Sequence, residues 1–338
     1  MHCFFFLYLF FISFVFACVF FFFLLRYDDY CNAKFRYSYG IEVFMSPVIA
    51  LHEDLQKRLE EYRSTRGFSP VKWIEHKCAA LNEYMASHGL KVCVTSVSGG
   101  IDSAVVLALC SRAMRMPNSP IVRNVGICQP ICSSAWALAR GRENIQSCGA
   151  LEVIVDQTEL HKQLSRIVET AVGIDGQNFA RGQLRSYMRT PVAYYVAQLY
   201  SQEGNAAIVM GTGNMDEDGY LAYFCKAGDG VVDVQLISDL HKSEVFLVAQ
   251  ELGVPANTLQ ASPSADLWEG QTDEEELGFP YDFVELYTGW CLQLSDEERQ
   301  SFLHSLSSDA RQQYEKYKDA CENTHRRNAH KLRGPINL

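Results

Sequence analysis

The stretch KVCVTSVSGGIDSAVVLALCSRAM, residues 91–114, joins two apolar runs through a pair of glycines. The run before the glycines is short and β-branched, which predicts a buried strand over 91–97. The run after them carries Ala, Leu and Met at helical spacing, which predicts a helix over 103–115. The chain therefore passes from strand to helix through a flexible turn.

Ser98, Gly99 and Gly100 form this turn, and Asp102 or Ser103 is expected to cap the helix. Free backbone N–H groups and the positive end of the helix dipole make such a turn a site for an anion, most naturally phosphate. The turn has no lysine, so it differs from the Walker-type phosphate loop. An ordinary capped glycine turn is the alternative interpretation of these residues alone.

The remainder of the chain alternates in the same way. Further strands are expected over 124–131, 151–157 and 206–214, and helices over 46–64, 73–89, 133–148, 159–172, 184–204 with a bend or break at Pro191, and 242–255. This alternation predicts an α/β fold with a doubly wound parallel sheet covered by helices on both faces. Ligands of such sheets bind at the carboxyl ends of the strands. The glycine turn and the loop GTGNMDED, residues 211–218, should therefore face one site.

That second loop is polar and acidic, and it follows a buried strand. Its chemical groups are Thr212, Asn214, Asp216, Glu217 and Asp218. Solvated loop charge is the ordinary explanation for such a run. Carboxylates that face a phosphate site, however, need a divalent cation between them and the phosphates. Asp102 and Glu217 are therefore candidate Mg²⁺ ligands, with ATP phosphates completing the shell.

Bulk composition excludes several classes of protein. The chain has 338 residues, of which 48% are hydrophobic and 21% charged, which is enough for a sizeable core. A net charge of −10 argues against a nucleic-acid partner, although a basic stretch, residues 324–333, lies near the C-terminus. The 12 cysteines show no C-x-x-C spacing, so we expect no zinc site. We expect reduced, buried thiols and a cytoplasmic location.

The N-terminus stands apart from the rest. Residues 4–25 contain no charge and are rich in Phe, which is long enough to cross a bilayer. A membrane anchor, a removed targeting segment and an upstream mis-start of translation are the three interpretations, and membrane contact follows only if 4–25 are retained. Met45 precedes an ordinary amphipathic stretch, which favours the mis-start. We therefore divide the chain into a doubtful extension, 1–44, and a functional domain, 45–338.

The motifs together resemble a known family. SGGIDS, residues 98–103, resembles the pyrophosphate loop of the ATP pyrophosphatase superfamily. GTGNMDED, KAGDGVVD, LISDLHKSEV, SPSADLWEGQTDEEELG and the terminal HK follow in the order and spacing of NAD synthetase, over roughly residues 70–335. The chain is similar to the ammonia-dependent form of that enzyme. This resemblance implies a homodimer that adenylates deamido-NAD with ATP and Mg²⁺ and then amidates it with ammonia.

The resemblance also implies roles for individual residues. The ATP contacts would be Ser96, Val97, Ser98, Gly99, Gly100, Ile101, Asp102, Ser103, Thr212, Lys242 and Ser264. The deamido-NAD contacts would be Tyr84, Arg189, Tyr194, Lys226, Asp229, Asp233, His330 and Lys331. Asp102 and Glu217 match the metal positions, and no residue matches a covalent nucleophile. For the two tyrosines helix packing is the alternative, and for His330 and Lys331 it is a frayed basic tail.

Three departures from the family pattern are visible. Ser96 stands where Gly is common, and Ser264 replaces a usual Thr but keeps the hydroxyl. The segment between Glu217 and Lys226 is one residue longer than in the bacterial pattern, which leaves the neighbours of Lys226 open. The acidic segment 264–278, with Gly270 and Gly278, is a candidate lid that would exclude water from the site.

The nitrogen donor follows from chain length. A glutaminase domain needs on the order of 200 residues of its own, and too few precede Ser96. Free ammonia is the expected donor, with a separate glutaminase partner left open. Two rival interpretations remain. A tRNA thiolase or GMP synthetase of the same superfamily is disfavoured by the cysteine spacing and the acidic charge. A non-catalytic nucleotide-binding module is disfavoured by the full set of charged loop residues.

Overall fold

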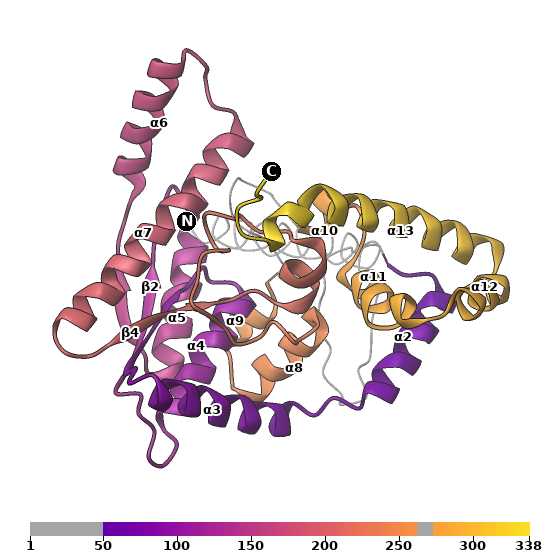
Figure 1. The fold of residues 1–338 in the computed structure, drawn as a ribbon, viewed down its shortest axis with the longest axis horizontal. Coiled ribbons are helices and arrows are strands. Elements are labelled where there is room, and N and C mark those ends of the chain that lie inside the picture. The colour runs from indigo at the N-terminus through magenta and orange to yellow at the C-terminus, as the bar shows by residue number, and fades with distance from the viewer. Residues whose placement is uncertain (1–49, 262–272) are drawn as a thin grey trace, which may run out of the picture. The chain divides into compact units, whose positions relative to one another are not determined.

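The computed structural model describes residues 50–261 and 273–338. Its centre is a parallel sheet of five strands in the order β3-β2-β1-β4-β5 (Figure 1). The strands are β1 (Val92–Ser96), β2 (Arg123–Cys128), β3 (Leu151–Ile154), β4 (Ala207–Gly211) and β5 (Val234–Gln235). The first four confirm the expected strands. The two-residue β5 has no sequence signal of its own and forms only by pairing with β4.

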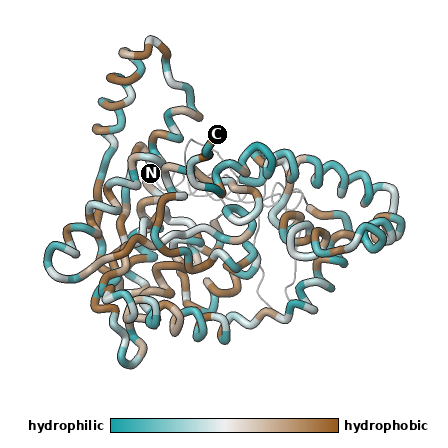
Figure 2. The backbone as a smooth tube through the Cα atoms, in the orientation of Figure 1, coloured by the Kyte–Doolittle hydropathy of each residue, from teal (hydrophilic) through white to brown (hydrophobic). Residues whose placement is uncertain are grey.

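Helices cover both faces of the sheet, which confirms the doubly wound fold. On one face Cys93, Ile208 and Met210 pack with α3 (Pro70–Ser87), α4 (Ile101–Met114) and α8 (Lys242–Glu251). On the other face Val92, Val94 and Val209 pack with Ala193 and Ala197 of α7 (Asn178–Gln202). Neighbouring strand residues therefore point to opposite faces, as the pleat requires. Figure 2 shows the brown, apolar backbone concentrated in this part of the molecule.

Two further helices complete the doubly wound part. α5 (Ala135–Cys148) joins the face of α4, where Ile145 packs with Val97, Leu107 and Cys128. α6 (Thr158–Val172) packs on α7, and Figure 1 shows it extending away from the sheet. Of the two alternatives expected at Pro191, the break is wrong, because α7 continues through Pro191 as one helix. Packing of both halves of α7 against neighbours outweighs the single backbone hydrogen bond that proline removes.

A second core joins the two ends of the described chain. α2 (Glu53–Arg66) packs with α11 (Tyr281–Glu285), η2 (Leu286–Trp290), α12 (Asp296–Ser305) and α13 (Ser308–Asn328). Its centre is aromatic: Phe283 contacts Tyr287, Tyr314 and Tyr317 at ring-centroid distances of 5.4–5.8 Å. The helices after residue 255 were not predicted from the sequence. The remaining short elements are η1 (Met215–Leu221), α9 (Ala256–Leu259), α10 (Asp273–Leu277), η3 (Cys291–Gln293) and η4 (Ala329–Leu332).

The described residues belong to one compact unit. Within them, no helix combines the length and the apolar character that crossing a bilayer requires. The Phe-rich segment 4–25 and residues 264–272 of the expected lid lie outside the described residues. Most described cysteines are buried free thiols, as expected, whereas Cys132 is exposed.

Candidate functional site

The main cavity opens at the carboxyl ends of β1, β2 and β4, where the parallel sheet predicts a ligand site. Its volume is about 550 Å³. The glycine turn, the loop after β4, the middle of α7 and the end of α13 all contribute to its walls. The two loops that the sequence analysis expected to meet therefore do face one cavity.

The glycine turn lies at one wall. Gly100 is the N-cap of α4. The expectation that Asp102 or Ser103 caps this helix is therefore wrong. Ser103 instead stabilises the turn from within: its Oγ donates to Gly100 O at 3.1 Å and accepts from Ser98 N at 3.3 Å. Gly100 N donates to Ser98 Oγ at 3.2 Å. Asp102 lies in the first turn of the helix and lines the cavity.

Lys242 lies between two carboxylates. Its Nζ donates to Asp102 Oδ2 and to Glu217 Oε1, each at 2.7 Å, and the side chain is buried. Burial by itself lowers the pKa of Lys242, but the charges and hydrogen bonds of Asp102 and Glu217 outweigh it and hold the pKa above its usual value. The ammonium is therefore charged at neutral pH. Three residues from three separate segments form one charged group.

Asn214 holds this group in place. It is fully buried, and its Nδ2 donates to Asp102 Oδ1 at 3.0 Å. Its Oδ1 accepts the backbone N–H groups of Asp216 and Glu217 at 3.1 and 3.0 Å, which caps η1. Asn214 belongs to the expected polar loop, but its role there was not predicted. An Asn before an acidic run is a signal for such a cap.

Two further carboxyl groups lie beside Lys242: Asp273 of the expected lid segment and Asp218 of the expected acidic loop, neither of which had an expected role of its own. Burial first, and then the charge of Glu217, raise the pKa of Asp273 to about 7. Burial first, and then the charges of Asp229 and Glu217, raise the pKa of Asp218 well above its usual value. Only the fold brings these groups together, because they come from α10 and η1.

The donor set at Asp102 and Glu217 suits a hard cation. Two oxygens already converge on one positive nitrogen, and carboxylate oxygens are ligands that Mg²⁺ prefers. Across residues 50–261 and 273–338, no group of three or more His, Cys, Asp or Glu side chains is arranged to hold a metal. A metal at this position would therefore depend on oxygens from a bound ligand as well.

The residues expected to bind ATP or its metal ion mostly line the cavity. Ser96, Val97, Ser98, Gly100, Ile101, Asp102, Ser103, Thr212, Glu217 and Lys242 all do so. Gly99 lies behind the turn, against Ala137 and Gly141 of α5. Ser264 is outside the described residues.

The residues expected to bind the dinucleotide divide into two groups. Arg189, Asp229 and Lys331 line the cavity. Tyr194 does not: its hydroxyl donates to Asp233 Oδ1 at 3.0 Å, and Asp233 Oδ2 accepts from Val209 N at 2.8 Å. This pair joins α7 to the edge of β4, so the structure favours the packing alternative for Tyr194 in a single copy of the chain.

Tyr84 lies near the C-terminal end of α3, just before β1, with 40% of its surface exposed and its ring 4.3 Å from that of His88. It does not line the cavity, because α3 ends at the amino edge of the sheet while the cavity is at the carboxyl edge. The expectation that Tyr84 lines the site is not met within one copy of the chain.

The C-terminal basic residues are held in place rather than frayed. Lys331 Nζ donates to Ala222 O at 3.2 Å and to Phe224 O at 2.8 Å. Lys226 Nζ donates to His330 O at 3.2 Å. Lys226 and His330 themselves are exposed and do not line the cavity. The tail is thus tied to the segment that follows η1.

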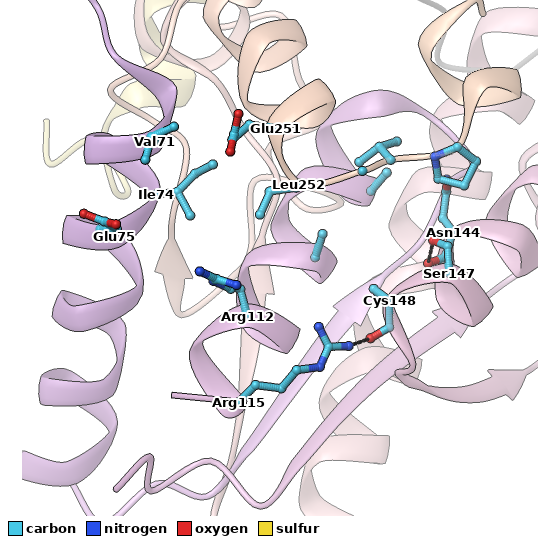
Figure 3. A pocket seen from close by; sticks show the side chains of 15 residues that line it. Val71, Ile74, Glu75, Arg112, Arg115, Asn144, Ser147, Cys148, Glu251 and Leu252 are labelled. Carbon is cyan, nitrogen blue, oxygen red and sulfur yellow. Dashed lines mark hydrogen bonds between the residues drawn. The ribbon is translucent and has the colours of Figure 1, made fainter. Parts of the chain in front are cut away.

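A second cavity, of about 200 Å³, lies away from the predicted site residues (Figure 3). It is bordered by α3, α4, α5 and the turn after α8, and Figure 3 shows Arg112 and Arg115 on its α4 side. Arg115 Nη2 donates to Cys148 O across this cavity wall. None of the residues expected to bind ATP or dinucleotide lines this smaller cavity.

Known proteins resemble this chain over most of its length. Residues 73–335 match the NAD synthase family. The NH(3)-dependent NAD(+) synthetase of Mesoplasma florum is 32% identical over 243 residues, which cover 71% of this chain and 93% of that protein. The protein of the same description from Alkaliphilus metalliredigens is 34% identical over 245 residues, covering 70% and 94%. A solved structure of NMN synthetase from Francisella tularensis has a TM-score of 0.65 at 25% identity, covering 80% of this chain and 99% of that one.

The matched range contains the glycine turn, the acidic loop, Lys242 and the C-terminal tail. The family match and the match to the solved structure thus both cover most of the chain. The protein belongs to the NAD synthase family.

Proposed function

We propose that this protein is a ligase that converts deamido-NAD to NAD with ATP and ammonia, releasing AMP and pyrophosphate. The single observation that carries the proposal is Lys242, held by Asp102 and Glu217 opposite the glycine turn. Family membership over residues 73–335 supports the same reaction.

The chemistry that suits this cavity has two steps. The nicotinate carboxylate is a poor electrophile, so it first attacks the α-phosphorus of ATP, forming an acyl-adenylate and releasing pyrophosphate. Ammonia then attacks the acyl carbon, and AMP leaves. In the first step the turn N–H groups would hold the departing pyrophosphate. Lys242 would offset the charge on the phosphate oxygens.

Exclusion of water matters in the second step, because hydrolysis of the adenylate would waste ATP. Glu276 and Leu277 of α10 line the cavity on the side of the expected lid. We therefore include the lid function of segment 264–278 in the proposal, with residues 264–272 outside the described range.

Mg²⁺ is part of the proposal. Asp102 and Glu217 are the residues that would hold it, because their oxygens converge on one cationic position. When bound, the ion would offset charge on the phosphate oxygens as a Lewis acid. Lys242 and the metal would share the two carboxylates, so ATP phosphates would supply the remaining oxygens.

We also propose that the protein is a homodimer joined through α6 and the start of α7. Ile167, Val168, Val172 and Phe179 on these elements are each at least 49% exposed. Phe179 is 63% exposed and also lines the main cavity, so the cavity opens on this apolar surface. A second copy would cover the surface and complete the cavity wall.

The buried free thiols favour a cytoplasmic location.

The test of the reaction uses the full-length chain and, in parallel, residues 45–338. Either is supplied with ATP, Mg²⁺ and ammonium, and with deamido-NAD or nicotinate mononucleotide. We expect NAD, AMP and pyrophosphate in equal amounts from deamido-NAD, and little product when glutamine replaces ammonium. Absence of NAD would refute the proposal, and preferential formation of NMN would reassign the substrate to the mononucleotide.

The matching variants are Asp102→Ala and Glu217→Ala. Each leaves Lys242 with one carboxylate and removes a metal ligand, so we expect the rate to fall by about 100-fold or more. Asp239→Ala is the control, because Asp239 is an exposed carboxylate paired with Lys77 and does not line the cavity. A near-normal rate in either test variant would remove that residue from the site.

A further inference from the structure

Three hydrogen-bonded side chains, two of them fully buried, form a chain behind Lys242. Tyr62 of α2 lies with its hydroxyl 3.0 Å from His241 Nε2. On the other side of the ring, His241 Nδ1 is 2.7 Å from Asp216 Oδ1. His241 and Asp216 are fully buried, and none of the three residues lines either cavity described above. They are therefore outside the set that can contact a substrate.

Each of two network residues directly precedes a cavity residue. Asp216 is followed by Glu217, and His241 is followed by Lys242. The Asp216–His241 contact ties the two loops together behind the cavity, and the Glu217–Lys242 contact ties them in front. The position of the front pair thus depends on the rear pair.

Asp216 also holds the backbone of α8. Its Oδ2 accepts the N–H of Lys242, the first residue of the helix, at 2.8 Å. One carboxylate thereby binds the ring of His241 and orients the residue that carries the ammonium. The bond leaves Asp216 with both oxygens engaged and directs Lys242 toward the cavity.

Tyr62 provides the fixed end of the chain. Its helix is joined to α8 by Arg66, which donates to Glu244 Oε2 at 2.9 Å. Its ring is close to Gly289 of η2, where a Cβ would overlap the phenol oxygen. The second core therefore holds Tyr62, and Tyr62 in turn contacts the face of His241 that points away from Asp216.

We propose that Tyr62, His241 and Asp216 are positioning residues that keep Lys242 and Glu217 aligned for the activation of ATP. The inference rests on the proposed function for the identity of the reaction. It predicts that the network acts on nucleotide binding and adenylation and leaves the use of ammonia unchanged. A network that serves folding alone would lower stability without this selectivity.

The test uses two substitutions at His241 of nearly equal size. Asparagine can place its amide near the position of Nδ1 and keep the contact with Asp216, whereas glutamine reaches the position of Nε2 and keeps the contact with Tyr62. The readout is the exchange of labelled pyrophosphate into ATP with deamido-NAD and without ammonia. We expect exchange within about tenfold of wild type for His241→Asn and about 100-fold slower for His241→Gln, because displacement of Lys242 by about 1 Å has an effect of the latter size.

Asp216 offers a second pair. In Asp216→Asn the amide oxygen can accept the Lys242 N–H while the amide nitrogen donates to His241, so we expect most activity to return relative to Asp216→Ala. The KM for ammonium should stay within about twofold in every variant, because none of these residues touches the cavity. Tyr62→Phe is the mild member of the series and keeps the test usable if the others do not fold. It should slow exchange by about fivefold.

Tyr287→Phe is the matched control, since Tyr287 donates its hydroxyl to Glu322 in the second core and does not line the cavity. It should lower the melting temperature and leave exchange unchanged. Binding of a non-hydrolysable ATP analogue with Mg²⁺ distinguishes failure of the proposed reaction from failure of the positioning proposal. Lack of wild-type turnover would refute the proposed reaction, while tenfold weaker analogue binding by His241→Gln than by His241→Asn would still support positioning. The positioning proposal would be overturned if the two His241 variants were equal in analogue binding and pyrophosphate exchange, or if Asp216→Ala equalled wild type in both.

Discussion

Gly99 shows how one residue joins the turn to the layer beneath it. Its φ is +88°, a conformation that L side chains rarely adopt. A Cβ at this position would also overlap Ala137 O of α5. The turn can lie this close to α5 only because glycine has no side chain. Glycine tolerates the positive φ, and it leaves room for Ala137 O. The positive φ is a local requirement for glycine, whereas the contact with α5 is a requirement of the tertiary structure.

We expect Gly99→Ala to lower the free energy of unfolding by about 3 kcal/mol and to abolish ATP binding, since it combines left-handed strain with overlap. Gly89→Ala is the matched control: its φ is +66°, but nothing lies within 4 Å of its Cβ. It should cost about 1 kcal/mol and leave nucleotide affinity unchanged. Urea unfolding and ATP titration of both variants are the measurements. Equal losses would show that the contact with α5 contributes nothing.

At the scale of elements, α2 is tied to the C-terminal helices by a buried ion pair. Arg63 donates to Glu285 Oε1 at 2.9 Å and to Oε2 at 2.6 Å, and the Glu285 side chain is 2% exposed. Burial raises the pKa of Glu285, but the Arg63 hydrogen bonds and charge outweigh it and bring the pKa below its usual value. The same helix holds Tyr62 against His241. α2 therefore supports the site without lining it.

Arg63→Ala should lower the free energy of unfolding by about 3 kcal/mol at pH 7, because it leaves a buried carboxylate without its cation. Glu285 contributes its stability above its unfolded pKa and loses it as the pH falls through the lower, folded pKa, so the difference from wild type should shrink toward pH 4. Arg142→Ala, which breaks an exposed pair with Glu152, is the control and should change little. Denaturant unfolding at both pH values checks this, and a pH-independent loss would contradict it.

At the scale of the whole molecule, the exposed apolar side chains gather on α6 and the segment leading into α7. Ile167 is 63% exposed, Ile174 68% and Phe179 63%. Patches of this kind on a folded protein mark interaction surfaces more often than free ones. Because Phe179 belongs both to this surface and to the cavity, we expect association and substrate affinity to be linked.

If the proposed homodimer forms through this surface, Ile167→Glu should leave a monomer at micromolar concentration, since the variant would bury a charge without a partner in the interface. The KM for deamido-NAD should rise in the same variant, because the cavity would lose its covering copy. Val122→Glu, a comparable exposed change outside α6 and α7, is the control. Light scattering after gel filtration measures the mass. A dimer that persists in Ile167→Glu would place the interface elsewhere. A monomeric wild-type protein would refute the proposed dimer.

The sequence alone determined the parallel sheet, because its strands and helices carry strong periodic patterns. β1 to β4 and α3 to α8 lie close to their expected positions. It also determined which two loops meet, since the carboxyl ends of parallel strands share one edge. Glycine, hydroxyl and acidic residues at those ends, with the family motifs, pointed to Asp102, Glu217 and Lys242 one by one, whereas the ion pairs that join the three are seen only in the fold.

Other features were decided only by the tertiary structure. Gly100 caps α4, Tyr84 lies at the opposite edge of the sheet from the cavity, and Tyr194 bonds to Asp233. The network of Tyr62, His241 and Asp216 joins segments separated by as many as 179 positions along the chain. Periodicity reports the face of an element that is buried, but not the element that covers it. Long-range hydrogen bonds between buried side chains are set when whole elements pack, and no local pattern encodes them.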